Sequence, residues 1–170
     1  MPPTSPYPAS SASDGRHKIA FVPKPTDGST INPLSVAVLT APTTLDVTYS
    51  FTPTGFKHDV TQAEVVDKRY TAPQDLSRGG KTSEKLEVQY VDSQDAGSAD
   101  VGLPKDAEGW FVRRKRVPNE VAWTKDQLVD VITVQAGVPR PDAPSENSLD
   151  TTTQGMFITQ PTVYAQKLVA

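Results

Sequence analysis

The stretch that decides the fold is Gly109–Pro141, which reads GWFVRRKRVPNEVAWTKDQLVDVITVQAGVPRP. It begins with aromatic and aliphatic residues, passes through a run of four cations and turns at Pro118-Asn119. It then enters the apolar segment Val129–Ala136, which a glycine and several prolines close. Two short β-type segments joined by a polar connection predict a β-hairpin. Nothing in the stretch resembles a catalytic loop.

The composition of the whole chain agrees with a strand-rich protein. The 170 residues include 19 Val and 19 Thr, against 9 Leu and 4 Ile. β-Branched side chains lose rotamer freedom in a helix and pack well on a pleated surface, so this composition favours strands. The length fits one domain with one core. A mean hydropathy of -0.43 is polar for such a domain, so we expect neighbouring subunits to supply part of the apolar contact.

Charge and residue types exclude several classes of function. The net charge of -3 leaves the chain without the basic footprint of a nucleic-acid-binding protein. The absence of cysteine excludes disulfides, thiol catalysis and thiolate metal sites. No apolar run approaches the roughly 20 residues that span a bilayer, so no membrane partner is expected. The N-terminus lacks the regions of a signal peptide. We therefore expect a protein that is made and kept in a cytoplasm, or released by lysis.

Alternation of apolar and polar residues marks two half-buried strands. In Asp46–Thr52 the apolar residues fall on one face, and the turn residues Pro53-Thr54-Gly55 follow. In Ser83–Val91 the apolar face is Leu86, Val88 and Tyr90. A first strand is expected at Lys18–Val22.

The remaining segments are expected to be connections. Residues 1–16 are rich in Pro and Ser and predict a flexible N-terminal arm, followed by a single β domain over residues 17–170. Thr71–Lys81 predicts a loop, Asp95–Leu103 a short helix and Gly137–Gly155 a long linker. Leu34–Thr40 fits either a helical turn or an extended link. The last strand-like segments are Met156–Thr159 and Thr162–Val169.

Three segments, in order, resemble the major tail tube proteins of long non-contractile-tailed bacteriophages. They are LTAPTTLDVTYSFTPTGFK at 39–57, DKRYTAPQDLSRGGKTSEKLEVQYV at 67–91 and DAEGWFVRRKRVPNEVAWTKDQLVDVITVQAGVP at 106–139. The third is the most specific, because a strand ending in WFVRR leads through a polar connection to VDVITVQAG and a proline-rich exit. The N-terminal arm departs from the family's pattern.

This resemblance implies a mainly β fold, a β-sandwich or barrel-like core with one short flanking helix and long loops. It also implies homohexameric rings that stack into a tube, with the tape measure and tail terminator proteins as further partners. Double-stranded DNA would pass through the lumen without specific binding, which an acidic or neutral wall favours because cations would bind the phosphates. Since the family's tube wall consists of hairpin strands, the candidate lumen-facing acids are Glu64, Asp67, Glu87 and Asp130.

The cations Arg113, Arg114, Lys115 and Arg116 form the strongest local charge run. Such a run serves as a localisation signal or a phosphate-binding patch in other proteins. On a strand, however, successive side chains alternate between faces, which splits the run into two pairs. We favour ion pairs across a subunit or ring boundary, and a solvated strand end is the alternative.

Val129–Ala136 is apolar on both faces apart from Asp130, Thr133 and Gln135. A strand of this kind is normally buried on both sides. The second face packs either against another copy of the chain, which makes Ile132 and Val134 interface candidates, or inside an ordinary β domain as a central strand.

No constellation of catalytic or metal-binding residues stands out. The two histidines, His17 and His58, lack partners at ligand spacing, so we interpret both as surface residues. Ser77–Lys81 has the small residues and basic flank of a phosphate loop, but a β segment follows where such loops need a helix. A flexible turn, or a loop that reaches a neighbouring subunit, is the better interpretation. We expect no cofactor and no enzymatic activity.

Three classes of function compete. A self-assembling tube subunit of a phage virion explains the strand that is apolar on both faces, the polar composition and the absence of catalytic motifs. A capsid-decorating or cell-surface β-sandwich binding module shares the composition but does not need the ordered resemblance. An enzyme would need a catalytic constellation that the sequence lacks.

Overall fold

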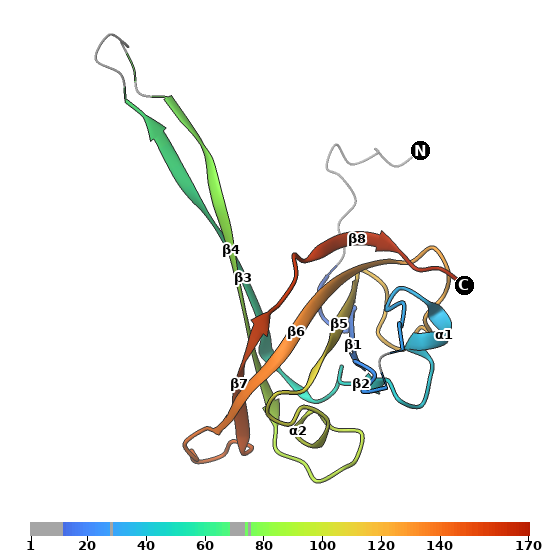
Figure 1. The fold of residues 1–170 in the computed structure, drawn as a ribbon. Helices are drawn as coiled ribbons and strands as arrows, with labels where there is room; N and C mark the ends of the chain where they lie inside the picture. The colour runs from blue at the N-terminus through green and yellow to red at the C-terminus, as the bar shows by residue number, and fades with distance from the viewer. Residues whose placement is uncertain (1–11, 28, 69–73, 75) are drawn as a thin grey trace, which may run out of the picture. The chain divides into compact units, whose positions relative to one another are not determined.

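The computed structural model describes residues 12–27, 29–68, 74 and 76–170. Most of the predicted arm, residues 1–11, lies outside the described residues. In the described part the chain is mainly β, as the sequence predicts, with eight strands and two short helices (Figure 1). The strands are β1 His17–Pro23, β2 Leu45–Asp46, β3 Phe51–Asp67, β4 Leu76–Val91, β5 Glu108–Lys115, β6 Leu128–Pro141, β7 Thr151–Ile158 and β8 Val163–Lys167. The helices are α1 Val36–Leu39 and α2 Ala99–Gly102.

Hydrogen bonds connect the described strands in the order β2-β1-β5-β6-β7-β4-β3, and β8 pairs with β6. The chain divides into two units: unit 1 contains residues 1–49, 109–133 and 161–170, and unit 2 contains residues 50–108 and 134–160. Strand β6 passes from one unit into the other, because the division falls between Thr133 and Val134.

Unit 1 is built on the antiparallel pair β1–β5, in which Phe21 lies opposite Phe111 with ring centroids 5.1 Å apart. Its apolar cluster joins residues that are distant in sequence, because α1, the β5–β6 connection and the C-terminal segment all contribute to it. The buried members are Ala20, Val22, Leu39, Val112, Trp123, Val129, Val131 and Leu168. Burial on this scale explains why the apolar segments Lys18–Val22 and Val129–Ala136 form strands, as predicted.

Unit 2 contains the β3–β4 hairpin, with β7 between β4 and the second half of β6. Leu86, Val88 and Tyr90 of β4 are all buried, which confirms the predicted alternation. The Tyr90 hydroxyl donates to Gln154 Oε1 at 3.2 Å, and Gln154 Nε2 donates to the carbonyls of Leu103 and Gly137 at 3.1 and 2.8 Å. These bonds satisfy the buried amide, which lies among apolar side chains.

The two helices are each four residues long. Helix α2 lies inside the predicted helical segment 95–103, and Ser98 Oγ caps it by accepting from the Val101 N–H at 3.3 Å. Helix α1 resolves the ambiguity at 34–40 in favour of a helical turn, which Thr40 closes by donating its hydroxyl to the Val36 carbonyl at 2.9 Å. Neither helix of the described residues has the length or apolar character to cross a membrane.

The predicted single strand over 46–52 is wrong. Strand β2 ends at Asp46 and residues 48–50 form a turn before β3 begins. The Asp46 carboxylate accepts from the Thr48 N–H at 3.1 Å, and the Ile19 N–H donates to the Thr48 hydroxyl at 3.0 Å. These local bonds compete with a strand ladder and turn the chain. Val47 is therefore buried while Tyr49 is exposed.

Two predicted turns lie inside strands. Pro53-Thr54-Gly55 lies within β3, where the pairing with β4 shifts register between Phe51 and Phe56, and does not end a strand. Gly79 and Gly80 belong to β4, where Gly79 pairs with Glu64 and Gly80 lies in a register shift, so the loop predicted over 71–81 does not extend through them. Residues 71–73 and 75 of that predicted loop lie outside the described residues.

The predicted linker 137–155 is also wrong. Strand β6 continues to Pro141 and β7 begins at Thr151, which leaves a connection of nine residues, 142–150. The pairing resumes at Pro139 opposite Gln154 after a register shift, so the proline-rich exit still pairs with β7.

Candidate assembly surfaces

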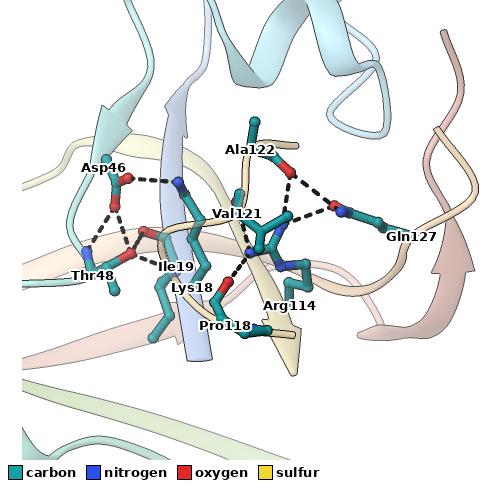
Figure 2. Close-up of polar contacts among 9 residues, drawn as sticks. All are labelled: Lys18, Ile19, Asp46, Thr48, Arg114, Pro118, Val121, Ala122 and Gln127. Atoms are coloured by element: carbon teal, nitrogen blue, oxygen red, sulfur yellow. Dashed lines mark hydrogen bonds and ion pairs between the residues drawn. The ribbon is translucent and has the colours of Figure 1, made fainter. Parts of the chain in front are cut away.

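Arg114 lies in the interior of unit 1, with 0% of its surface exposed. Its guanidinium donates to the carbonyl oxygens of Pro118, Val121 and Ala122 and to the Gln127 side chain, at 2.8 to 3.0 Å (Figure 2). It also lies 5.0 Å from the centre of the Trp123 ring. Four residues of the β5–β6 connection therefore accept hydrogen bonds from this one side chain. This position corrects the prediction that Arg114 crosses a subunit boundary, because the side chain is buried and both terminal nitrogens donate inside the chain.

Asp130 lies beside the other face of the cation run. Its carboxylate is 2.6 Å from Lys115 Nζ and 3.2 Å from Arg113, and it accepts from the Ala165 N–H at 3.1 Å. Burial alone raises the pKa of Asp130, but these hydrogen bonds and the two cations lower it below its ordinary value. Asp130 is thus a buried link between β5, β6 and β8, and not the exposed lumen acid that the sequence predicts.

A cavity of about 280 Å³ opens beside this ion cluster. Cations and one carboxylate line one part of it, and apolar side chains line the rest. Its lining residues are Arg113, Lys115, Arg116, Val117, Leu128, Asp130 and Ala165, all in unit 1. Lys115 and Arg116 are exposed to solvent there, so two members of the predicted interface run remain accessible.

Ile132 and Val134 are buried within the single chain. This burial agrees with the alternative in which β6 is a central strand, since β5 lies on one side of it and β7 and β8 on the other. An apolar strand of this kind needs no second copy to remove it from water.

The hairpin of β3 and β4 extends past the rest of the sheet in unit 2 (Figure 1). Strand β7 pairs with β4 only from Leu86 to Val91, whereas β3 pairs with β4 as far as Asp67 opposite Leu76. The outer hairpin, residues 59–67 and 76–85, exposes four large apolar side chains: Val60, Val65, Val66 and Leu76. Val65 and Val66 are neighbours in one strand and point to opposite faces, so both faces of the outer hairpin are apolar in part.

Two predicted lumen acids lie on the outer hairpin. Glu64 is exposed, and Asp67 forms an ion pair with Arg78 at 3.1 Å. The segment Ser77–Lys81 is strand here and no helix follows it. The phosphate-loop interpretation is therefore excluded for this segment.

Glu87 lies on the polar face of the sheet in unit 2. Glu87 pairs with Gly155 of β7, and Gln89, two residues further along β4, pairs with Thr153. The Glu87 carboxylate is 3.9 Å from Lys85 and 3.7 Å from Arg140. Lys57 lies opposite Glu87 and forms an ion pair with Asp59 at 3.7 Å, and Asp142 accepts from Gln89 and Thr153, so this face carries three cations and three acids.

The histidines differ in their surroundings. The His58 side chain is 5% exposed and lies 3.3 Å from the Glu84 carboxylate, so the surface position predicted for it is wrong. Partial burial and the charges of Arg113 and Lys115 lower the pKa of His17. Among the described residues, no group of three or more His, Asp or Glu side chains could hold a metal ion.

The connection 142–150 lies inside the linker predicted over 137–155, but its bounds are narrower than predicted. Asp142 at its start accepts hydrogen bonds from Gln89, Thr151 and Thr153 at 2.8 to 3.0 Å, which lower its pKa. Leu149 near its end is 70% exposed. The sequence signal for these bounds is a Pro-Ser pair between Asp142 and Asp150, in a segment that contains no Lys or Arg.

The described residues define the chain as a mainly β protein with an extended hairpin. Comparison with known families makes this specific: the model of the phage tail tube protein family matches residues 4–170. The chain belongs to that family and is a structural component of a phage tail. No curated protein matched the sequence.

A solved structure shares the fold. One chain of the 6-fold symmetrised cryo-EM structure of the anti-feeding prophage baseplate aligns with a TM-score of 0.60 at 9% identity. The alignment covers 91% of this chain and 95% of that chain. The fold is thus kept where almost all of the sequence differs.

Proposed function

We propose that six copies of this chain form a ring, and that rings stack into the tube of a long non-contractile phage tail. The tube assembles in the host cytoplasm together with the tape measure and tail terminator proteins. On infection the genome passes through its bore.

The observation that carries this proposal is the outer hairpin. A hairpin of two strands is marginally stable in water, because it lacks a third strand or a packed layer. This one also exposes Val65 and Val66 on opposite faces. Exposed apolar side chains on a contiguous element mark interaction surfaces in soluble proteins. A neighbouring copy that covers the outer hairpin removes these side chains from water and supplies the missing packing.

Two further findings support the proposal. The polar face around Glu87 carries nearly balanced charge, which suits a bore wall that DNA must pass without being held. The similar solved structure is described as 6-fold symmetrised, in agreement with six copies to a ring. Glu87, Glu64 and Asp67 remain our candidates for the lumen side.

The proposal is tested by sedimentation and negative-stain electron microscopy of the purified chain over a range of concentrations. We expect rings or tubes at high concentration. Val66→Glu should remain monomeric with an unchanged circular dichroism spectrum, because Val66 is exposed in the single chain. Val101→Glu, at an exposed apolar position on α2, is the matched control and should assemble. A wild-type chain that stays monomeric at every concentration contradicts the proposal.

A further inference from the structure

The formal charge of the chain divides unevenly between its two units. Unit 1 carries nine Lys and Arg against six Asp and Glu, a net charge of +3. Unit 2 carries eight Lys and Arg against fourteen Asp and Glu, a net charge of -6. Each copy therefore presents a surface of each sign, and complementary potentials steer association and fix its register.

The positive surface has a defined recess. The exposed cations Lys115 and Arg116 line the cavity beside Asp130. Leu128, itself 51% exposed, forms part of its apolar wall. The apolar part of the lining, Val117, Leu128 and Ala165, offers a phosphate group no side-chain hydrogen-bond donor. A mixed acidic and apolar protein segment fits this lining better.

The connection 142–150 has that mixed character. It contains Asp142, Glu146 and Asp150 and no Lys or Arg. Asp142 is held by the hydrogen bonds at the base of the connection, which leaves Glu146, Asp150 and the apolar Leu149 exposed. No ion pair within the described residues involves either of these two acids.

Hydrogen bonds within the connection 142–150 order its turn. The hydroxyls of Ser145 and Ser148 are 2.6 Å apart, and Ser148 also donates to the Ser145 carbonyl at 2.9 Å. Asn147 between them has a φ of 58°, in the left-handed region that Asn tolerates well. A turn that is ordered before binding loses less conformational entropy on association.

We propose that the connection 142–150 of one copy docks in the Lys115–Arg116 cavity of a second copy. Glu146 and Asp150 face the two cations, and Leu149 packs on Leu128. This inference rests on the proposed self-assembly and names a contact by which it occurs. The two surfaces differ, so the contact is heterologous and continues from copy to copy, as a ring or a stacked tube requires.

The test uses charge reversal in the full chain, at the exposed positions Arg116→Glu and Glu146→Lys. Each variant alone should raise the protein concentration needed for assembly by about tenfold or more, because like charges then face each other. An equimolar mixture of the two variants should recover assembly, since each supplies the surface that the other has lost. Lys125→Glu and Glu120→Lys, both exposed in unit 1, are the charge-matched controls.

The outcomes separate the two proposals. If the wild-type chain assembles and both variants assemble equally well, the docking contact is wrong while the proposed function stands. Equal loss in the controls, or no recovery on mixing, also overturns the contact. Competition by an excess of short duplex DNA would assign the cavity to phosphate binding instead. A wild-type chain that never assembles removes the basis for both proposals.

Discussion

Arg114 fixes the path of the β5–β6 connection through one side chain. Its guanidinium donates to three backbone carbonyls and one side-chain amide between Pro118 and Gln127, which lie up to 13 positions away along the chain. Burial lowers the pKa of this guanidinium and the Asp46 charge opposes that effect, but arginine remains protonated in proteins. A methionine of similar length would remove all four of these hydrogen bonds.

We therefore expect Arg114→Met to lower the free energy of unfolding by about 2–4 kcal/mol, as for buried polar groups that lose a charged partner. Arg116→Met, at the exposed end of the same run, should change it by no more than about 0.5 kcal/mol. Urea denaturation of both variants measures the difference. Equal stability of the two would mean that the hydrogen bonds to Arg114 contribute little to the fold.

Tyr90 provides a prediction about pH. Burial, with smaller contributions from the charges of Asp100 and Asp92, raises the pKa of its hydroxyl to about 12. The unfolded chain ionises this group near pH 10, so the folded state binds the proton more tightly. The stabilisation is fully present below pH 10 and is lost as pH rises towards 12. Tyr90→Phe should show a shallower loss of stability over this range in urea denaturation at several pH values. An unchanged slope would contradict the assignment.

At the scale of elements, local pattern predicted the strands whose burial is decided by their own residues. Leu86–Tyr90 and Val129–Ala136 formed as expected because one or both faces are covered along their length. The pattern in Asp46–Thr52 failed because Thr48 bonds to Ile19, a residue 29 positions away. The pair Gly79-Gly80 predicted a turn, but both residues lie within β4 and Gly79 pairs with Glu64 of β3. Alternation of apolar and polar residues indicates which face of a strand is apolar, but it does not indicate which strand pairs with it.

For Ile132 of β6 the sequence predicts a role in the subunit interface, whereas its burial predicts a role in the stability of the single chain. Ile132→Asp should unfold the chain, because Ile132 is 0% exposed and an unpaired carboxylate there loses its hydration. Circular dichroism should show lost β signal at concentrations where the wild type is monomeric. A folded variant that fails only in assembly would instead support the interface role predicted for this residue.

At the scale of the whole molecule, the candidate site was partly accessible from sequence. The cation run and Glu87 were visible as local patterns, but the inward turn of Arg114 and the pairing of Asp130 with two cations depend on contacts between β5 and β6. The family resemblance indicated a phage tail protein, because related chains can keep the order and the residue pattern of their segments at low sequence identity. A structural neighbour at 9% identity illustrates the same point.

The proposed bore leads to a prediction for the assembled tail. Glu87→Lys should permit assembly but slow DNA ejection, because the new cation joins Lys85 and Arg140 and would be repeated around the ring. A cationic band binds the phosphate backbone and releases counterions. Glu87→Gln is the control and should have a smaller effect. Ejection rates measured in phage at two salt concentrations check this, since the delay should shrink at high salt.

The central claim is that this chain builds a tube in which each copy covers its neighbour's outer hairpin. Cryo-electron microscopy of the purified chain at an assembling concentration tests it most directly. The account predicts stacked rings of six copies with Val65 and Val66 buried against an adjacent copy. Assemblies in which both side chains remain in solvent, or particles that stay monomeric throughout, would contradict it.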